Sequence, residues 1–291
     1  MKSIYTLIPD VQELLTKKGW WSDEIDSYFT GTTSNRIREA FTENGRKSGL
    51  RLSRMGDQCP RQLWYSVHHP EYAEILPASA TLKYTYGHII EVLALTLAKA
   101  AGHQVEGEQD EITLDGVPGH RDCVIDGNIV DIKSSSTRGM AKFKDSQSFE
   151  KDDAFGYLDQ IDGYVVGSNA DVVVLNKKSG FIWAIDKTLG NMVLYEHVAR
   201  NEHIKNRISD YKRIANLSEP PSCQCGTTRH GTTGHLKLDT RASYSAYKHC
   251  CFPKLTTYTD KGKPIYLIGE RHGEFIHNES TVTFSNSSKK I

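Results

Sequence analysis

The stretch from Gly119 to Ser136, GHRDCVIDGNIVDIKSSS, constrains the fold more than any other part of the chain. It predicts two short strands, because Asp126-Gly127-Asn128 is a strong turn signal between two apolar runs. Side chains two residues apart on a strand leave the same face, so Asp131 and Lys133 would lie together. Asp122, on the first strand, can reach that face across the hairpin. Two carboxylates and one ammonium group on an apolar hairpin indicate a divalent-cation site, and carboxylate oxygens suit Mg²⁺ and Mn²⁺.

The composition is that of an ordinary globular chain. Of the 291 residues, 38% are hydrophobic and 25% are charged. The 36 basic and 36 acidic side chains give a formal net charge of zero, so a nucleic-acid partner would need a local basic patch. No apolar run approaches the roughly 20 residues of a membrane span, and the first residues lack the apolar core of a signal peptide. We therefore expect a cytoplasmic protein without a membrane segment.

Residues 86–102, YGHIIEVLALTLAKAAG, are the clearest predicted helix, because apolar residues recur at helical spacing and Gly102 suits the C-cap. Glu91 is the single acidic side chain in this run. It would be either a solvated residue on the outer face or a third metal carboxylate, with His88 as the rival ligand. We favour Glu91.

Residues 154–166 predict a second helix, on which Gln160 and Tyr164 share a face because they are four residues apart. Between this helix and the hairpin lies a run of hydroxyl and basic side chains that includes Ser134 and Arg138. Such a run is usually a solvated loop. Beside a metal site it could also hold phosphate groups, since hydroxyl, Lys and Arg side chains are common backbone contacts.

The remaining elements are predicted from alternation and turn residues. Residues 104–120 predict a first strand that ends at Asp115-Gly116, and residues 171–176 and 180–185 predict two more strands. Residues 10–19 and 34–41 predict helices near the N-terminus. Residues 192–217 predict one long amphipathic helix that ends before Pro220, and short strands or an extended tail follow Pro264.

The six cysteines are unlikely to be structural disulfides inside a cell. Four of them lie in a Gly/Thr-rich stretch with several histidines: Cys223, Cys225, Cys250 and Cys251. Thiolates and imidazoles at short spacing are ligands for Zn²⁺ or an iron–sulfur cluster. Cys59, beside Trp64 and Tyr65, would by itself be a buried core cysteine. Reduced, unligated core cysteines are the alternative for the whole set.

Five motifs, taken in their order along the chain, resemble those of the PD-(D/E)XK nuclease superfamily. The similarity is to its RecB-like branch, which includes the CRISPR-adaptation nucleases. The motifs are Cys59-Pro60-Arg61, Gly87 with Glu91, Gly119-His120-x-Asp122, Asp131-Ile132-Lys133 and Gln160-x-x-x-Tyr164. Each motif is common by itself, and it is their joint order that carries the resemblance.

The resemblance implies an α/β fold with a mixed central β-sheet flanked by helices. Residues 1–51 would be an N-terminal helical region, residues 52–217 the nuclease core, and residues 218–291 a Cys/His-rich region packed near Cys59. The implied activity is a metal-dependent DNA nuclease, with an exonuclease favoured over an endonuclease. It would act with recombination, repair or replication proteins in a bacterium or a phage-infected cell.

The resemblance also implies roles for individual residues. Glu91, Asp122, Asp131 and the main-chain carbonyl of Ile132 would hold one or two Mg²⁺ or Mn²⁺ ions. Lys133 would orient the attacking water or stabilise charge, while Gln160 and Tyr164 would position the DNA strand. Cys59 with three of the four late cysteines would hold a [4Fe–4S] cluster, for which Zn²⁺ is the rival. A non-catalytic DNA-binding protein, or an Fe–S or zinc structural protein on the same fold, is the alternative function.

Overall fold

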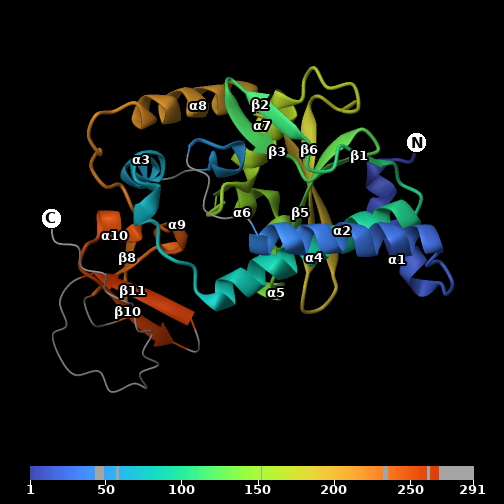
Figure 1. Ribbon diagram of the computed structural model, residues 1–291, viewed down its shortest axis with the longest axis horizontal. Coiled ribbons are helices and arrows are strands. Elements are labelled where there is room, and N and C mark those ends of the chain that lie inside the picture. Colours follow the sequence, from blue (N-terminus) through green and yellow to red (C-terminus); the bar gives the residue numbers. More distant parts are fainter. Residues whose placement is uncertain (43–48, 57–58, 152, 232–234, 261–262, 269–291) are drawn as a thin grey trace.

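The structure is a computed structural model that describes residues 1–42, 49–56, 59–151, 153–231, 235–260 and 263–268. It confirms the expected fold class, since a mixed central β-sheet is flanked by helices (Figure 1). The sheet has five strands, in the order β1 (Val105–Glu106), β4 (Cys123–Ile125), β5 (Asn128–Ser135), β6 (Ser179–Asp186) and β7 (Met192–Val198). It is mixed because β5 and β6 run parallel, whereas the other neighbouring strands are antiparallel.

The hairpin that the sequence predicts is formed by β4 and β5. Ile125 pairs with Asn128, which leaves Asp126 and Gly127 as the two residues of the turn. Their φ angles are 48° and 74°, and a tight hairpin turn of this kind needs positive values at both positions. Asp122 lies one residue before β4, and not within the strand as expected.

Helices cover both faces of the sheet and bury a core on each. One core includes Cys123, Ile125 and Trp183, packed against α1 (Leu7–Thr16) and α4 (Ala78–Ala100). The other core includes Val124, Ile129 and Ile182, which face a second set of helices. This set comprises α3 (Pro60–His68), α7 (Tyr157–Gly167) and α8 (Asn201–Ala215). Helix α2 (Asp23–Thr42) packs along α4.

Smaller elements complete the core. Strands β2 (Glu111–Leu114) and β3 (Val117–His120) form a separate two-stranded sheet, so residues 104–120 do not make the single strand that was expected. The parallel pair β5 and β6 needs a crossover, which contains α5 (Thr137–Met140), α6 (Ser146–Lys151) and α7.

The C-terminal part forms its own sheet beside the core (Figure 1). Its order is β10 (Leu255–Asp260), β11 (Lys263–Ile268), β9 (Leu236–Leu238) and β8 (Thr227–Arg229). Two short helices, α9 (Thr240–Tyr244) and α10 (Lys248–Cys251), join it to α3. A strand after Pro264 is confirmed by β11, while residues 269–291 lie outside the described residues. Within the described residues, no helix combines the length and apolar character needed to cross a bilayer.

Two predicted elements are wrong. Residues 192–217 are not one helix, because Tyr195 and His197 are buried and Glu196 and Val198 are exposed, which is the alternation of strand β7. Helix α8 begins only after Arg200, whose backbone N–H donates to Asp162. Residues 171–176 form no strand.

The segment 171–176 braces the hairpin turn instead. The backbone N–H groups of Leu175 and Asn176 both donate to the carbonyl oxygen of Gly127. The Asn176 side chain also donates to the side-chain oxygen of Asn128, over 3.0 Å. The segment therefore fixes the β4–β5 turn through these hydrogen bonds, and the fixed turn keeps the strand that carries Asp131 in register.

Candidate active site

Asp131 and Lys133 leave the same face of β5, as the strand period requires. The Nζ atom of Lys133 lies 2.7 Å from Oδ2 of Asp131. The Asp131 side chain is only 1% exposed, and apart from this ion pair neither carboxylate oxygen has a hydrogen-bond partner among the described residues. A buried carboxylate without enough partners is unfavourable unless another cationic group completes its environment.

Asp122 reaches the hairpin at the open edge of β5. Strand β4 pairs only with residues 128–130, so β5 continues beyond its partner from Asp131 onward. There the Oδ2 atom of Asp122 accepts a hydrogen bond of 2.7 Å from the backbone N–H of Ile132. The N–H and C=O groups of a strand residue point toward the same neighbour, so the Ile132 carbonyl also faces this edge.

Glu91 approaches the same edge from helix α4. It is 9% exposed, so the alternative of a solvated residue on the outer face is wrong. Its Oε1 atom accepts hydrogen bonds from Nε2 of Gln109 at 2.9 Å and from Nη2 of Arg36 at 3.3 Å. Arg36 lies on α2 and was not expected from the sequence, because nothing in its local spacing indicates a contact 55 residues away.

The pKa values of Glu91 and Asp131 are both raised. Burial, and next the charge of Asp122, raise the pKa of Glu91 to about 8. Burial raises the pKa of Asp131 to about 7. Lys133 opposes this effect, and the charge of Asp122 adds to it. Burial would lower the pKa of Lys133, but Asp131 and Asp122 outweigh it and raise that pKa, so the ammonium group keeps its proton. Simultaneous ionisation of these carboxyl groups is therefore unfavourable, and a cation at the edge of β5 would relieve the repulsion.

Gln160 and Tyr164 share a face of α7, as their spacing requires. Nε2 of Gln160 donates to the hydroxyl oxygen of Tyr164 over 2.9 Å, and both side chains are buried. Burial, followed by the charges of Asp131 and Asp122, raises the pKa of Tyr164, so its hydroxyl lies within electrostatic range of the carboxylates. A Cβ atom at Gly119 would lie 2.7 Å from Cβ of Leu52 and 3.1 Å from the Tyr164 ring, which explains a glycine there.

Ser134 and Arg138 flank the carboxylates without touching them. Ser134 is half-buried on β5, two residues beyond Ile132, and Gly87 of α4 passes close to its hydroxyl group. Arg138 is exposed on α5. Contact of these two side chains with phosphate groups stays a prediction.

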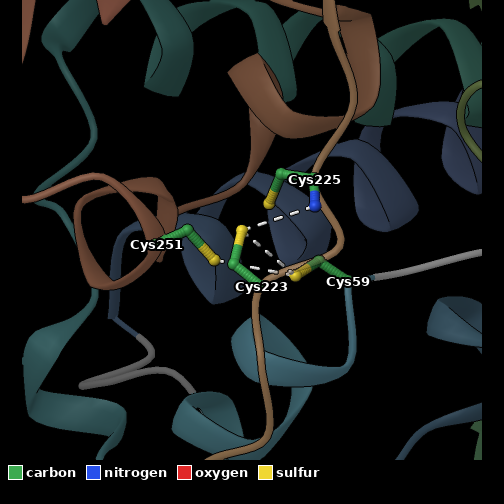
Figure 2. A group of neighbouring side chains, drawn as sticks. All are labelled: Cys59, Cys223, Cys225 and Cys251. Atoms are coloured by element: carbon green, nitrogen blue, oxygen red, sulfur yellow. Dashed lines mark hydrogen bonds between the residues drawn. The ribbon is translucent and has the colours of Figure 1, made fainter. Parts of the chain in front are cut away.

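Four cysteines from three distant segments meet beside the core (Figure 2). Cys59 is the N-cap of α3, Cys251 ends α10, and Cys223 and Cys225 lie in the segment after α8. The four sulfur atoms lie within 4.8 Å of one another. Cys59 Sγ is 3.6 Å from Cys251 Sγ and 4.0 Å from Cys223 Sγ, and all six cysteines of the chain are free.

Cys250 does not join this group. Its carbonyl oxygen accepts a hydrogen bond from Nε of Arg61, which fixes α10 against α3 and directs the neighbouring Cys251 toward the other sulfur atoms. Cys123 is completely buried in the core. One early cysteine, Cys59, therefore lies with three late ones, Cys223, Cys225 and Cys251, while Cys250 lies outside the group.

The four cysteines fit a thiolate metal centre. Two N–H groups donate hydrogen bonds to the sulfur atoms. Nε2 of Gln62 donates to Cys225 Sγ over 3.0 Å, and the backbone N–H of Gln224 donates to Cys59 Sγ over 3.2 Å. Such hydrogen bonds are usual around metal-bound thiolates. Four ligands about 2.3 Å from one tetrahedral ion would be separated by about 3.8 Å, close to the observed spacing. A [4Fe–4S] cluster would need the sulfur atoms to move apart. The donors alone do not identify the metal.

A second polar cluster, missed by sequence reasoning, joins α7 to α8. Asp162 is fully buried, and its Oδ1 atom lies 2.7 Å from Nε2 of His197 while Oδ2 accepts from Nε of Arg200 at 2.8 Å. Asp159 pairs with Arg200 and His203. Burial would raise the pKa of Asp162, but hydrogen bonds and charge from His197 and Arg200 outweigh it and lower that pKa. Because cationic partners already satisfy both carboxylates, the cluster stabilises the packing of two helices.

The comparisons with known proteins give weak similarities. No protein-family model matches the chain. No curated protein matches it either. Among solved structures, the chain is similar to the crystal structure of SSO0001 at 16% identity and a TM-score of 0.43, over 78% of this chain and 97% of that one. It is also similar to LHK-Exo, an alkaline exonuclease from Laribacter hongkongensis, at 12% identity and a TM-score of 0.29, over 55% of this chain and 87% of that one. Neither similarity is close enough to assign a function.

Proposed function

We propose that this chain is a metal-dependent DNA nuclease. The observation that carries the proposal is the Asp131 carboxylate, which is buried at an open strand edge and, within the described part of the chain, has only Lys133 as its partner. Glu91 and Asp122 bring further carboxyl groups to the same edge, and the charge of Asp122 contributes to the raised pKa of Glu91, which supports one shared site. Carboxylate and carbonyl oxygens are the ligands that Mg²⁺ and Mn²⁺ prefer.

Glu91, Asp122, Asp131 and the Ile132 carbonyl would hold the ion. A divalent ion held by these residues would supply Lewis-acid chemistry: it would polarise the scissile phosphate and lower the pKa of the attacking water. Lys133 would contribute directly, because an ammonium group that stays protonated can hold that water or stabilise charge developing on the phosphate. Tyr157, whose ring centroid lies 5.1 Å from Lys133 Nζ, would limit the movement of the ammonium group.

Gln160 and Tyr164 would position the DNA strand relative to the carboxylates. Both side chains are buried, so they suit a role at the inner end of the site more than a role in gripping DNA at the surface. The hydrogen bond from Gln160 fixes the Tyr164 hydroxyl near the carboxylates. Ser134 and Arg138 would contact phosphate groups further out. The preference for DNA ends and the role in recombination, repair or replication are proposed from the motif resemblance. A cytoplasmic location is proposed as well.

The proposal is tested by digestion of end-labelled linear DNA, single- and double-stranded, beside a closed circle. Each substrate is incubated with Mg²⁺, Mn²⁺ or EDTA, for the wild type, for Lys133→Ala and for Lys178→Ala, an exposed turn lysine that serves as the control. We expect metal-dependent loss of linear DNA, unchanged in Lys178→Ala and reduced about 100-fold or more in Lys133→Ala. A spared circle would indicate the exonuclease mode. Folded, metal-loaded wild type that leaves all substrates intact would refute the nuclease.

The cysteine group favours a second metal site, which would have a structural role. It joins α3 to segments that lie 164 and 192 residues further along the chain. We propose that Cys59, Cys223, Cys225 and Cys251 hold Zn²⁺ or a [4Fe–4S] cluster that fastens the C-terminal sheet to the core. Metal analysis and the visible absorption spectrum of anaerobically purified protein distinguish the two: zinc without colour, or iron with sulfide and broad visible absorption.

A further inference from the structure

A cleft of about 720 Å³ lies beside the cysteine group. One wall comes from the core, where Arg54 and Phe155 contribute, and the opposite wall comes from the C-terminal part, where Arg241 and Tyr244 contribute. Tyr84, in the first turns of α4, closes one side. The catalytic proposal above uses none of these five residues.

The floor of the cleft is fixed by two backbones in contact. A Cβ atom at Gly56 would lie 2.4 Å from Cα of Gly156, so only glycine allows this approach. Gly156 also has a φ of +70° and is the N-cap of α7, the helix that carries Gln160 and Tyr164. The crossing therefore sets the direction of the segment before α7, and with it the position of Phe155.

Aromatic rings lead from the proposed active site into this cleft. The Tyr157 ring lies over Lys133 and stacks with Phe155 at a centroid distance of 5.6 Å. Phe155 in turn contacts Tyr244 edge-on at 5.2 Å. Phe155 is 45% exposed and Tyr244 is 73% exposed, although both are large rings in contact with other aromatic residues. Exposed rings in such a row suit a flat ligand that stacks.

Cationic groups accompany the rings. Arg54 and Arg241 line the cleft, and Nζ of Lys142 lies 4.3 Å from the Tyr157 ring centroid and 5.2 Å from that of Phe155. The lining also includes Asp239, whose carboxylate caps α9 by accepting from the Ala242 backbone N–H. The chain has no net charge, so a nucleic-acid partner would need a local basic surface. The cleft offers one, because it combines cationic side chains for phosphate groups with aromatic rings for stacking.

We propose that the cleft binds single-stranded DNA on its way to the active site, with bases stacked on Phe155 and Tyr244 and phosphates beside Arg54 and Arg241. Single strands are favoured because a duplex keeps its base faces stacked inside and cannot offer them to protein rings. The proposal rests on the proposed function for the identity of the substrate. Binding, however, is measured without hydrolysis and is independent of it.

The experiment compares two fluorescent oligomers of equal length by anisotropy in EDTA: oligo-dT and an abasic deoxyribose-phosphate oligomer. The variants are Tyr244→Ala, Phe155→Ala and the conservative Tyr244→Phe. Tyr5→Ala is the control, since this tyrosine is exposed and packs on Phe181 of the sheet, outside the cleft lining. Far-UV circular dichroism and thermal melting verify that each variant is folded.

We expect the wild type to bind oligo-dT roughly tenfold more tightly than the abasic oligomer, because the bases stack on aromatic rings. Tyr244→Ala and Phe155→Ala would lose most of this preference, while Tyr244→Phe and Tyr5→Ala would keep it. If the wild type binds both oligomers equally, or if the alanine variants keep the preference, the proposal is overturned and the exposed rings are left for a protein partner. If the wild type prefers oligo-dT but digests no DNA, the proposal that the cleft binds single-stranded DNA is supported and only the proposed nuclease activity is refuted.

Discussion

Lys133 Nζ lies 2.7 Å from Asp131 Oδ2 at the point where β4 has ended and the edge of β5 is open. The pairing is a direct result of the two-residue strand period, which places both side chains on one face. Among the residues that the structure describes, Lys133 is the one cationic partner of Asp131, and the carboxylate oxygens of Asp131 have no further hydrogen-bond partner. The site therefore combines a fixed ammonium group with carboxylates that have unused capacity for a metal ion.

Replacing Asp131 by Asn should remove the effect of divalent ions on stability. Wild-type protein should melt at a higher temperature in Mg²⁺ or Mn²⁺ than in EDTA, because a ligand at 100 times its Kd adds about 2.7 kcal/mol. Asp131→Asn should lose this increase and, in EDTA, be less stable than wild type, since the substitution leaves the Lys133 ammonium group without its carboxylate partner. Asp115→Asn, at an exposed turn, is the control. An undiminished increase in the Asp131 variant would place the ion elsewhere.

Arg36→Gln should tighten metal binding. The guanidinium of Arg36 lies 3.3 Å from Oε1 of Glu91, where its charge opposes a cation on the same carboxylate. Without it, the Kd for Mn²⁺ should fall severalfold, as measured by titration followed by electron paramagnetic resonance. Arg38→Gln, two residues away and exposed on the same helix, should leave the Kd unchanged. Equal affinities for Arg36→Gln and wild type would mean that Arg36 does not compete with the ion.

Cys251→Ser and Cys250→Ser should behave differently although the residues are adjacent. Cys251 belongs to the group of four sulfur atoms, whereas Cys250 lies outside it. Cys251→Ser should lower the zinc or iron content and the melting temperature, because a structural metal contributes to folding free energy. Cys250→Ser should retain both. Elemental analysis with thermal melting is the measurement, and equal metal content in the two variants would exclude the proposed ligand set.

Asp162→Asn should destabilise the protein in a pH-dependent way. Because His197 and Arg200 hold the pKa of Asp162 below its unfolded value, its contribution is fully present above about pH 4 and is lost as the pH falls through the folded pKa. Arg200 is partly solvated, so we expect the low end of the range for a broken buried pair, about 3 kcal/mol at pH 7. Denaturant unfolding at pH 7 and pH 3 measures it, with Glu202→Gln as the exposed control on α8. A loss that does not shrink at pH 3 would contradict the charge mechanism.

Local signals in the sequence predicted the elements that carry the site. The Asp126-Gly127 turn, the apolar periodicity of 86–102 and the spacing of Gln160 and Tyr164 each act within a few residues, and β4, β5, α4 and α7 confirm them. The segment 192–217 was misassigned because a strand and a helix follow each other with only Ala199 and Arg200 between them. A single amphipathic pattern was read across both elements.

Contacts between distant segments could not be predicted in the same way. Arg36 reaches Glu91 only because α2 packs along α4, and Asp162 meets Arg200 only because α7 packs on α8. The choice between Cys250 and Cys251 depends on how Arg61 of α3 holds the backbone of α10. These relationships are set by tertiary packing, which leaves no period in the sequence.

The cysteine group has a consequence for how the protein is made. Cys59 is synthesised early, but its partner Cys251 follows 192 residues later. During translation the central sheet, which ends with β7, can therefore form before the four thiols are complete. Metal capture would then be the final step of assembly, and a shortage of the metal would leave a core already built with its C-terminal sheet unattached.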